Sequence, residues 1–122
     1  MTVLVWVGVA LLGGVGALSR WTLDGLVSAR WGREFPLGTL AVNLTGAFTL
    51  GLLVGAGVQG YLLLLLVGVA ALGSYTTFST WMFESHRLGE DGERRLAVAN
   101  LAVSLAAGLV VASVGWALGE AW

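Results

Sequence analysis

Long runs of apolar residues without a single charge divide the chain into segments of membrane-spanning length. No charged residue occurs within 1–19, 35–83 or 96–119. A transmembrane helix needs about 20 predominantly apolar residues, so the first and last runs each fit one helix and the middle run fits two. The glycine-rich stretch 55–60 is the predicted turn within the middle run. The four predicted helices span about 3–21, 37–57, 61–83 and 96–118.

The composition favours a membrane protein over a soluble one. The 122 residues are 57% hydrophobic and 11% charged, whereas soluble domains carry about 25% charged residues; the mean hydropathy is +0.89. A net charge of −1 offers no basic patch for nucleic acid. Cysteine is absent and His86 is the single histidine, which excludes thiolate and multi-histidine metal sites. We therefore predict an all-α membrane protein that binds no nucleic acid. Residues 1–122 would form one domain in a lipid bilayer.

Two of the predicted helices carry an asparagine among small residues at helical spacing. These stripes consist of Thr39, Asn43, Ala47, Gly51 and Gly55 in the second helix, and of Asn100, Ser104, Gly108 and Ala112 in the fourth. Small residues let helix backbones approach closely in lipid. An amide at membrane depth needs partners, so it faces the helix bundle or a wet cavity. The stripes are therefore either packing seams or walls of a narrow polar path.

The third predicted helix changes its character halfway. Residues 61–72 are almost purely apolar and reach only about 18 Å as a helix, which is short of a hydrocarbon core of about 30 Å. The octet 73–80, with the sequence GSYTTFST, must then lie at membrane depth. Its many hydroxyl groups and its glycine indicate a helix that is broken in mid-membrane. Discontinuous helices expose backbone groups that bind ions, so we expect an ion-related role here.

Three motifs keep a fixed order and spacing along the first three helices. They are GG-x-GA-x-x-R over 13–20, P-x-GT-x-x-x-N-x-x-G over 36–46, and G-x-x-TTFST over 73–80, which is followed by Glu84. The chain thereby resembles the family of fluoride channels called Fluc, or CrcB, over essentially its whole length. This resemblance implies a passive, fluoride-selective channel rather than an enzyme. It also implies that the channel exports fluoride from the cytoplasm across a bacterial or archaeal plasma membrane and so limits its toxicity.

The resemblance further implies an assembly. Two four-helix subunits would form an inverted, antiparallel dimer with two fluoride pores along the interface. A structural sodium ion would lie at the helix break, held by the backbone carbonyls of Gly73 and Thr76 from both subunits. A buried cation on the dimer axis would tie the two subunits together.

The resemblance also assigns roles to individual side chains. The implied fluoride pathway is lined by Asn43, Phe78, Ser79, Thr80, Trp81, Asn100 and Ser104, and the implied pore vestibule by Arg20 and Glu84. Aromatic ring edges carry partial positive charge, and amide and hydroxyl donors can replace the water around fluoride. Two positions depart from the family pattern. Trp81 stands in place of a second phenylalanine and adds an indole N–H donor, and Asn100 stands where the family often has tyrosine.

The arginines predict an orientation. All six (Arg20, Arg30, Arg33, Arg87, Arg94 and Arg95) fall in or beside the segments 22–36 and 84–95, the larger predicted loops. The positive-inside rule places such loops in the cytoplasm and both termini outside. A chain with one dominant orientation would need an oppositely oriented paralogue as its inverted partner. Six acidic residues in the same segments blunt the bias, so a homodimer stays open as well.

Other classes of protein fit the sequence less well. A small drug–proton antiporter needs a membrane-embedded carboxylate in its first helix, and residues 1–19 contain none. A non-transporting assembly subunit would use the small-residue stripes for packing but would leave the hydroxyl-rich octet unexplained. A hydrolytic triad needs a histidine beside a serine, and His86 lies in a charged segment outside the predicted helices.

Overall fold

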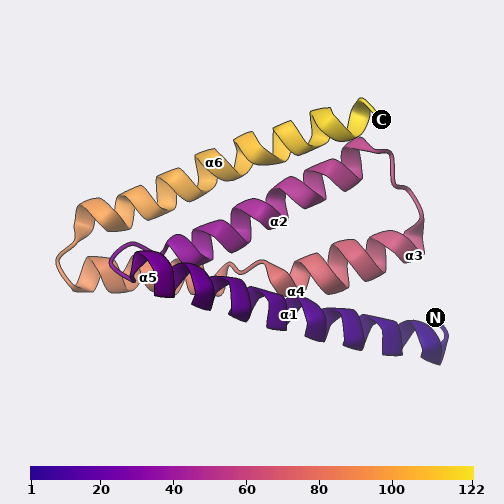
Figure 1. Ribbon diagram of the computed structural model, residues 1–122, viewed down its shortest axis with the longest axis horizontal. Helices are drawn as coiled ribbons and strands as arrows, with labels where there is room; N and C mark the ends of the chain where they lie inside the picture. Colours follow the sequence, from indigo (N-terminus) through magenta and orange to yellow (C-terminus); the bar gives the residue numbers. More distant parts are fainter.

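Four helical segments run back and forth along the long axis of the molecule (Figure 1). The computed structural model describes residues 1–122 and contains no strand. The elements are α1 (Val3–Trp31), α2 (Leu37–Gly55), α3 (Tyr61–Leu63), the π-helical segment η1 (Leu64–Leu72), α4 (Gly73–Tyr75), α5 (Ser79–Glu90) and α6 (Arg94–Glu120). The stretch from α3 to α5 forms one segment, and all four segments are long and apolar enough to cross a membrane. The prediction of an all-α protein with four such segments is confirmed.

The helices extend well beyond the charge-free runs. α1 continues to Trp31, and α5 continues to Glu90. The prediction of loops over 22–36 and 84–95 is therefore wrong for most of their length, because the connections span only 32–36 and 91–93. Charges limit the part of a helix that can lie in hydrocarbon, but they do not end a helix outside it.

Glycines mark the true ends of these two helices. Gly32, directly after α1, has φ +83°, and Gly92, two residues after α5, has φ +84°. This left-handed conformation is easy for glycine and costly for other residues, which is why helices so often end there. The ends of α2 and α6 differ from the predicted ones by at most two residues.

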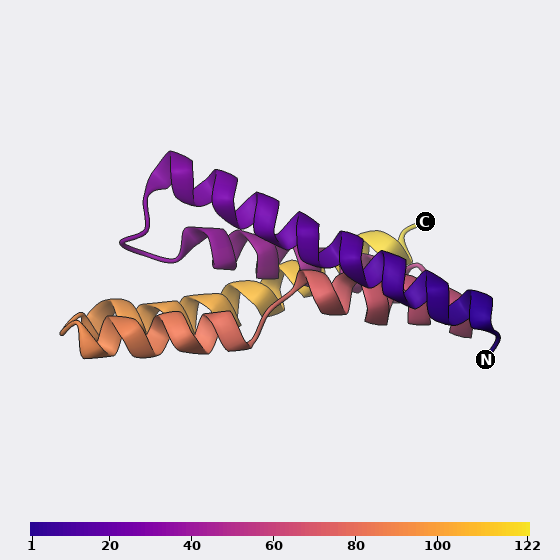
Figure 2. The same ribbon diagram turned by 90° about the horizontal axis from the view of Figure 1, so that it is seen from below.

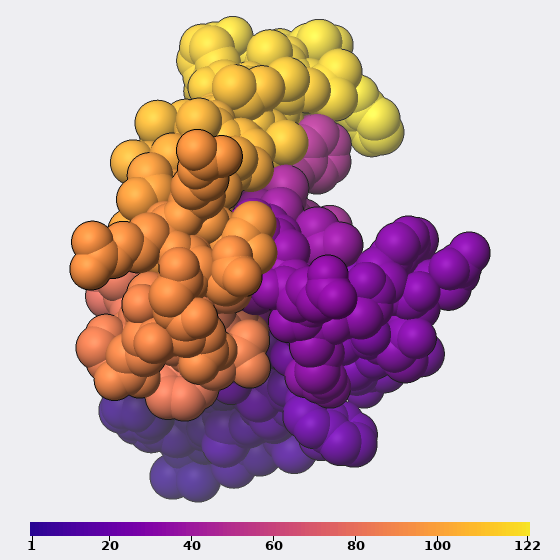
Figure 3. Space-filling view, turned by 90° about the vertical axis from the view of Figure 1, so that its left-hand side faces the viewer, coloured from indigo at the N-terminus to yellow at the C-terminus, as the bar shows by residue number.

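Both chain termini and the connection 56–60 lie at one end of the molecule, and the connections 32–36 and 91–93 lie at the other (Figure 1). α1 packs against η1, α4 and α2 but does not contact α5. Figure 2 shows the reason, since α1 and α5 diverge toward the end that carries the two connections. We call this end the loop end. Figure 3 looks onto it and shows α5, in orange, and the α1–α2 connection, in purple, on opposite sides of this end.

α2 and α6 form the most extensive helix pair, and glycines make their close approach possible. A Cβ atom at Gly51 would collide with the carbonyl oxygen of Ala112, and one at Gly115 with the carbonyl oxygen of Phe48. Backbone-to-backbone contact of this kind is typical of helices that pack in lipid. The C-terminal part of the α2 stripe, with Gly51 and Gly55, is therefore a packing seam against α6. On α6, by contrast, a Cβ atom added at Gly108 would meet no atom within 4 Å.

Only 13 of the 122 residues are buried, and the surface is dominated by large apolar side chains. Soluble proteins rarely expose apolar patches of this extent. Together with the four membrane-length segments, this surface defines a multi-pass membrane protein whose outside is suited to lipid or to another apolar chain.

Candidate functional site

The third segment is interrupted between Tyr75, the last residue of α4, and Ser79, the first of α5. Thr76 has an extended backbone, with φ −77° and ψ 159°. Its N–H and its hydroxyl both donate to the carbonyl of Leu72, at 2.9 and 3.0 Å, and so close the last turn before the interruption. The residues between the two helices, 76–78, need partners other than a helix for their backbone groups. We call this stretch the break.

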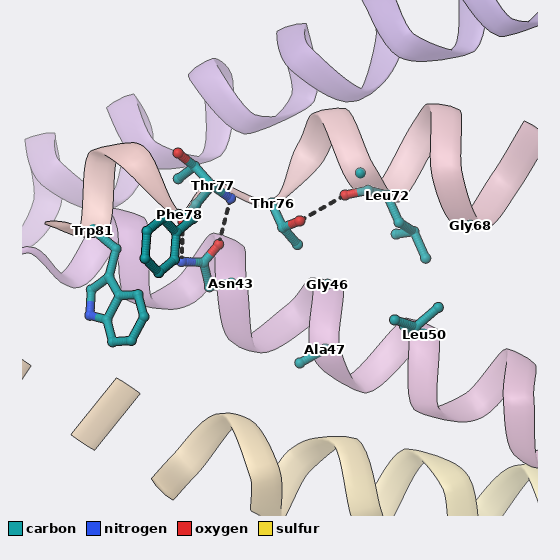
Figure 4. Close-up of a pocket in the computed structure, with 11 residues that line it drawn as sticks. Asn43, Gly46, Ala47, Leu50, Gly68, Leu72, Thr76, Thr77, Phe78 and Trp81 are labelled. Carbon is teal, nitrogen blue, oxygen red and sulfur yellow. Dashed lines mark hydrogen bonds between the residues drawn. The ribbon is translucent and has the colours of Figure 1, made fainter. Parts of the chain in front are cut away.

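Asn43 of α2 supplies two of these partners (Figure 4). Its Nδ2 donates to the carbonyl of Thr77 at 2.9 Å, and its Oδ1 accepts from the Thr77 N–H at 2.8 Å. One side-chain amide therefore satisfies both backbone groups of Thr77. A primary amide has two N–H groups, so the second N–H of Asn43 remains free for another acceptor. The prediction that this amide at membrane depth finds partners is confirmed.

The side chain of Thr77 caps the N-terminus of α5, a role that the sequence analysis missed. Its Oγ1 accepts the Thr80 N–H at 3.2 Å and donates to Thr80 Oγ1 at 3.0 Å. A threonine that caps a helix N-terminus in this way satisfies an amide without an intrahelical partner. Thr77 is also 8% exposed, so it faces the interior. The rule that serine or threonine precedes a helix by a few residues is the signal that could have identified it.

A cavity of about 360 Å³ lies beside the break. Its lining combines polar groups of Asn43, Thr76 and Thr77 with apolar residues of α2 and η1, and Phe78 and Trp81 stand at its edge (Figure 4). Phe78 is 70% exposed. Its ring meets that of Trp81 edge to face, with centroids 5.7 Å apart and planes at 81°. The structure thus brings together three of the predicted pathway residues, namely Asn43, Phe78 and Trp81. Ser79 follows directly and is exposed.

The two predicted residues of α6 lie elsewhere. Asn100 is 1% exposed and donates from Nδ2 to Ser85 Oγ at 2.9 Å. Ser104 donates to Asn100 Oδ1 at 3.4 Å. Neither residue lines the cavity at the break. The side chain at 100 is short and turns to α5, so these two residues lie apart from the other predicted pathway residues, and their place in the pathway stays a prediction.

The indole of Trp81 also differs from the prediction. Its Nε1–H donates to the backbone carbonyl of Asn100 at 3.1 Å. An indole has a single N–H, so the expected additional donor is already occupied.

Arg20 and Glu84, the predicted vestibule residues, line two polar cavities between the break and the loop end. The first cavity, of about 200 Å³, includes Arg20, Thr39 and Thr80, and the second, of about 280 Å³, includes Thr80 and Glu84. Thr80 is common to both, so the cavities adjoin. Thr39 donates its hydroxyl to Glu84 Oε1 at 3.1 Å, which joins α2 to α5.

Arg20 reaches the break itself, because its Nη1 lies 3.5 Å from the carbonyl oxygen of Thr76. The sequence analysis counted Arg20 among the six arginines on the side of the two larger loops. α1 continues for eleven residues beyond Arg20, to Trp31, so only the other five arginines lie at the loop end.

The carbonyl oxygens of Gly73 and Thr76 fit a small hard cation, which prefers oxygen ligands. In a continuous helix the Thr77 N–H would bond to Gly73, but it donates to Asn43 instead, so the Gly73 carbonyl loses its helical partner. Thr76 accepts only the long bond from Arg20. No group of three or more acidic, histidine or cysteine side chains could hold a metal ion. Any cation here would therefore depend on backbone oxygens, and two oxygens per chain leave room for others from a second chain.

Fold and site together define a multi-pass helical membrane protein with a polar, aromatic-edged break in its third segment. The family model described as "CrcB-like protein, Camphor Resistance (CrcB)" matches residues 7–116, and the chain belongs to this CrcB family. The family predicted from the sequence motifs is thereby confirmed.

Similar proteins carry names that state a transported ion. The chain is 52% identical over 119 residues to "Fluoride-specific ion channel FluC 2" of Mycolicibacterium paratuberculosis, covering 98% of this chain and 97% of that protein. A protein of the same name from Mycobacterium tuberculosis strain H37Rv is 48% identical over 115 residues, covering 94% and 90%. "Fluoride-specific ion channel FluC" of Citrifermentans bemidjiense is 43% identical over 111 residues, covering 88% and 90%. These relatives are named as ion channels, a class distinct from enzymes.

Proposed function

We propose that this protein is a passive, fluoride-selective ion channel. The similarity to proteins named as fluoride-specific ion channels, at up to 52% identity over nearly the whole chain, supports the substrate. Within the molecule, the observation that carries the proposal is the exposed Phe78 ring beside the Asn43 amide at the break. The ring edge and the amide N–H both present partial positive charge to an anion without the full charge that would trap it.

The mechanism follows from the hydration of the ion. Fluoride holds its water tightly, so its passage requires donors that replace this water. The free N–H of Asn43, the hydroxyl groups of Ser79 and Thr80, and the ring edges of Phe78 and Trp81 are such donors. A narrow path excludes chloride because chloride is larger. No carboxylate lines the cavity at the break, which favours passive flow over exchange with protons.

The proposal includes a second subunit in inverted orientation and two pores per dimer. The break then lies in mid-membrane on the dimer axis. The carbonyls of Gly73 and Thr76 from both subunits would hold a structural sodium ion, whose charge would tie the subunits together. The exposed apolar surface supports an apolar partner in addition to lipid. In a cell, the channel would let fluoride leave the cytoplasm through the plasma membrane and so limit its toxicity.

The test is ion efflux from liposomes that contain the purified protein, with fluoride and chloride measured in parallel. Rapid loss of fluoride without loss of chloride is the expected result. Absence of fluoride efflux from well-folded protein, both alone and with a co-expressed paralogue, would contradict the proposal. Equal efflux of both ions would retain a channel but remove its selectivity.

A further inference from the structure

We infer that Asn100 is a positioning residue, which from α6 fixes the indole of Trp81 on α5 and, through it, the aromatic edge of the cavity at the break. The inference rests on the proposed function, because it treats this cavity as part of the ion path. It gives Asn100 a role that acts through Trp81 rather than through contact with the ion.

A closed ring of hydrogen bonds carries the inference. Trp81 Nε1 donates to the backbone carbonyl of Asn100 at 3.1 Å, and Asn100 Nδ2 donates to Ser85 Oγ at 2.9 Å. Ser85 Oγ in turn donates to the backbone carbonyl of Trp81 at 2.8 Å. The ring therefore begins and ends on Trp81. Asn100 is 1% exposed and Ser85 is 7% exposed. Buried polar groups that lose a partner are costly, so each bond holds the others in place.

The ring of hydrogen bonds determines which part of Trp81 faces the cavity. Because its single N–H points to α6, the indole can offer only its C–H groups and its face to the cavity. The same bond opposes rotation of the ring, which would leave a partly buried N–H without a partner. Phe78 meets this fixed ring at 5.7 Å and 81°. The orientation of the exposed Phe78 ring is thus coupled to α6, although no residue of α6 lines the cavity.

The two positions that depart from the family pattern, 81 and 100, are therefore bonded to each other. A larger aromatic residue stands on α5 and a smaller residue on α6. Asn100 has almost no free surface, and its side chain contacts Ser85 and Ser104, so a tyrosine there would break the bond to Ser85. Phenylalanine at 81 would lose the bond from the indole to α6. Because both substitutions open the same ring of hydrogen bonds, we expect their effects not to add.

The experiment compares Asn100→Ala, Asn100→Tyr, Trp81→Phe and the double variant Trp81→Phe/Asn100→Tyr in two measurements. The first is fluoride efflux from liposomes. The second is the indole N–H resonance of Trp81 in NMR spectra, assigned by its loss in Trp81→Phe. Trp6→Phe is the matched control, because Trp6 is 58% exposed and its only hydrogen bond outside the helix ladder is a backbone one, which phenylalanine keeps. Asn100→Ser is a second, milder variant in case the alanine variant does not fold.

We expect each single variant at 81 or 100 to lower fluoride efflux about tenfold, and the double variant to lose little more than the worse single variant, because both substitutions break the same ring of hydrogen bonds. Asn100→Ala keeps the backbone carbonyl that accepts from Trp81 but removes the bond to Ser85, so it should loosen the ring and shift the Trp81 resonance. Trp6→Phe should change neither efflux nor this resonance. Additive effects in the double variant, or an unmoved resonance in both Asn100→Ala and Asn100→Ser, would overturn the inference. A wild-type protein without fluoride efflux would instead contradict the proposed function, while the resonance would still test the positioning.

Discussion

Asn43 shows how a single side chain can hold a break in a helix. Its amide replaces, on both sides of Thr77, the hydrogen bonds that a continuous helix would have made. The sequence predicted that Asn43 needs a polar partner, because an amide in lipid cannot stay alone. Its actual partner could not be predicted, because it depends on how closely α2 approaches the break. That approach is set by Gly46, where a Cβ atom would collide with the side chain of Thr76.

Asn43→Asp tests this role while conserving shape. The carboxylate keeps an acceptor for the Thr77 N–H but places an oxygen against the Thr77 carbonyl, which then lacks its donor. We expect a loss of about 1–3 kcal/mol of stability, measured by thermal unfolding in detergent, and a loss of fluoride efflux because a negative charge faces the anion. Unchanged stability would mean that the two hydrogen bonds contribute nothing to the break.

Phe78→Ile tests the aromatic edge. Isoleucine keeps the apolar character but has no ring edge with partial positive charge, so we expect fluoride efflux to be abolished while the protein elutes as wild type in size-exclusion chromatography. Phe83→Ile is the comparison, because Phe83 is similarly exposed, at 66% against 70%, but lines the polar cavity of Glu84 and not the cavity at the break. Full efflux in the Phe78 variant would remove the ring edge from the mechanism.

Elements were predictable where their signal is local. The charge-free runs located all four membrane-length segments, and the hydroxyl-rich octet 73–80 contains the residues at which the third segment is interrupted. The helix ends at Trp31 and Glu90 were missed, since charge marks the edge of the hydrocarbon and not the end of a helix. The glycines at 32 and 92 were the better signal. The turn of Asn100 toward α5 was not predictable, because it depends on the packing of two helices that the sequence does not position.

The contact between α2 and α6 can be tested with two glycines of the same helix. Gly115→Ala introduces a Cβ atom that collides with the Phe48 carbonyl, so we expect a loss of about 1–3 kcal/mol of stability. Gly108→Ala meets nothing within 4 Å and should be neutral or stabilising by up to about 1 kcal/mol. Thermal unfolding in detergent checks both. If Gly108→Ala proved the more damaging, the face of α6 at Gly108 would have to pack against a second chain.

On the scale of the whole molecule, the arginines give the subunit two unlike ends. Five of the six arginines lie at the loop end, Arg20 lies at the break, and the end with both termini has none. Because lysine and arginine determine orientation, we expect the loop end in the cytoplasm. An inverted dimer would then pair this chain with an oppositely oriented paralogue.

Labelling of single-cysteine variants in intact cells measures this orientation. The chain has no native cysteine, so cysteines at Asp91, an exposed residue of the 91–93 connection, and near the C-terminus report separately on the two ends. We expect an impermeant reagent added outside to label only the terminal site. Equal labelling of both sites would show dual insertion and would favour a homodimer.

The break also has a consequence for the exchange of amide hydrogens with water. The first hydrogen bond of α5 runs from the Met82 N–H to the Phe78 carbonyl. The N–H of Phe78 itself has no acceptor within the chain. An amide without a partner is tolerated at membrane depth only where water or another ligand reaches it. In deuterated buffer, the amide of Phe78 should therefore exchange rapidly in lipid nanodiscs, whereas the neighbouring amides of Thr76 and Met82 stay protected. Slowing of this single exchange by added fluoride would report directly where the anion meets the backbone.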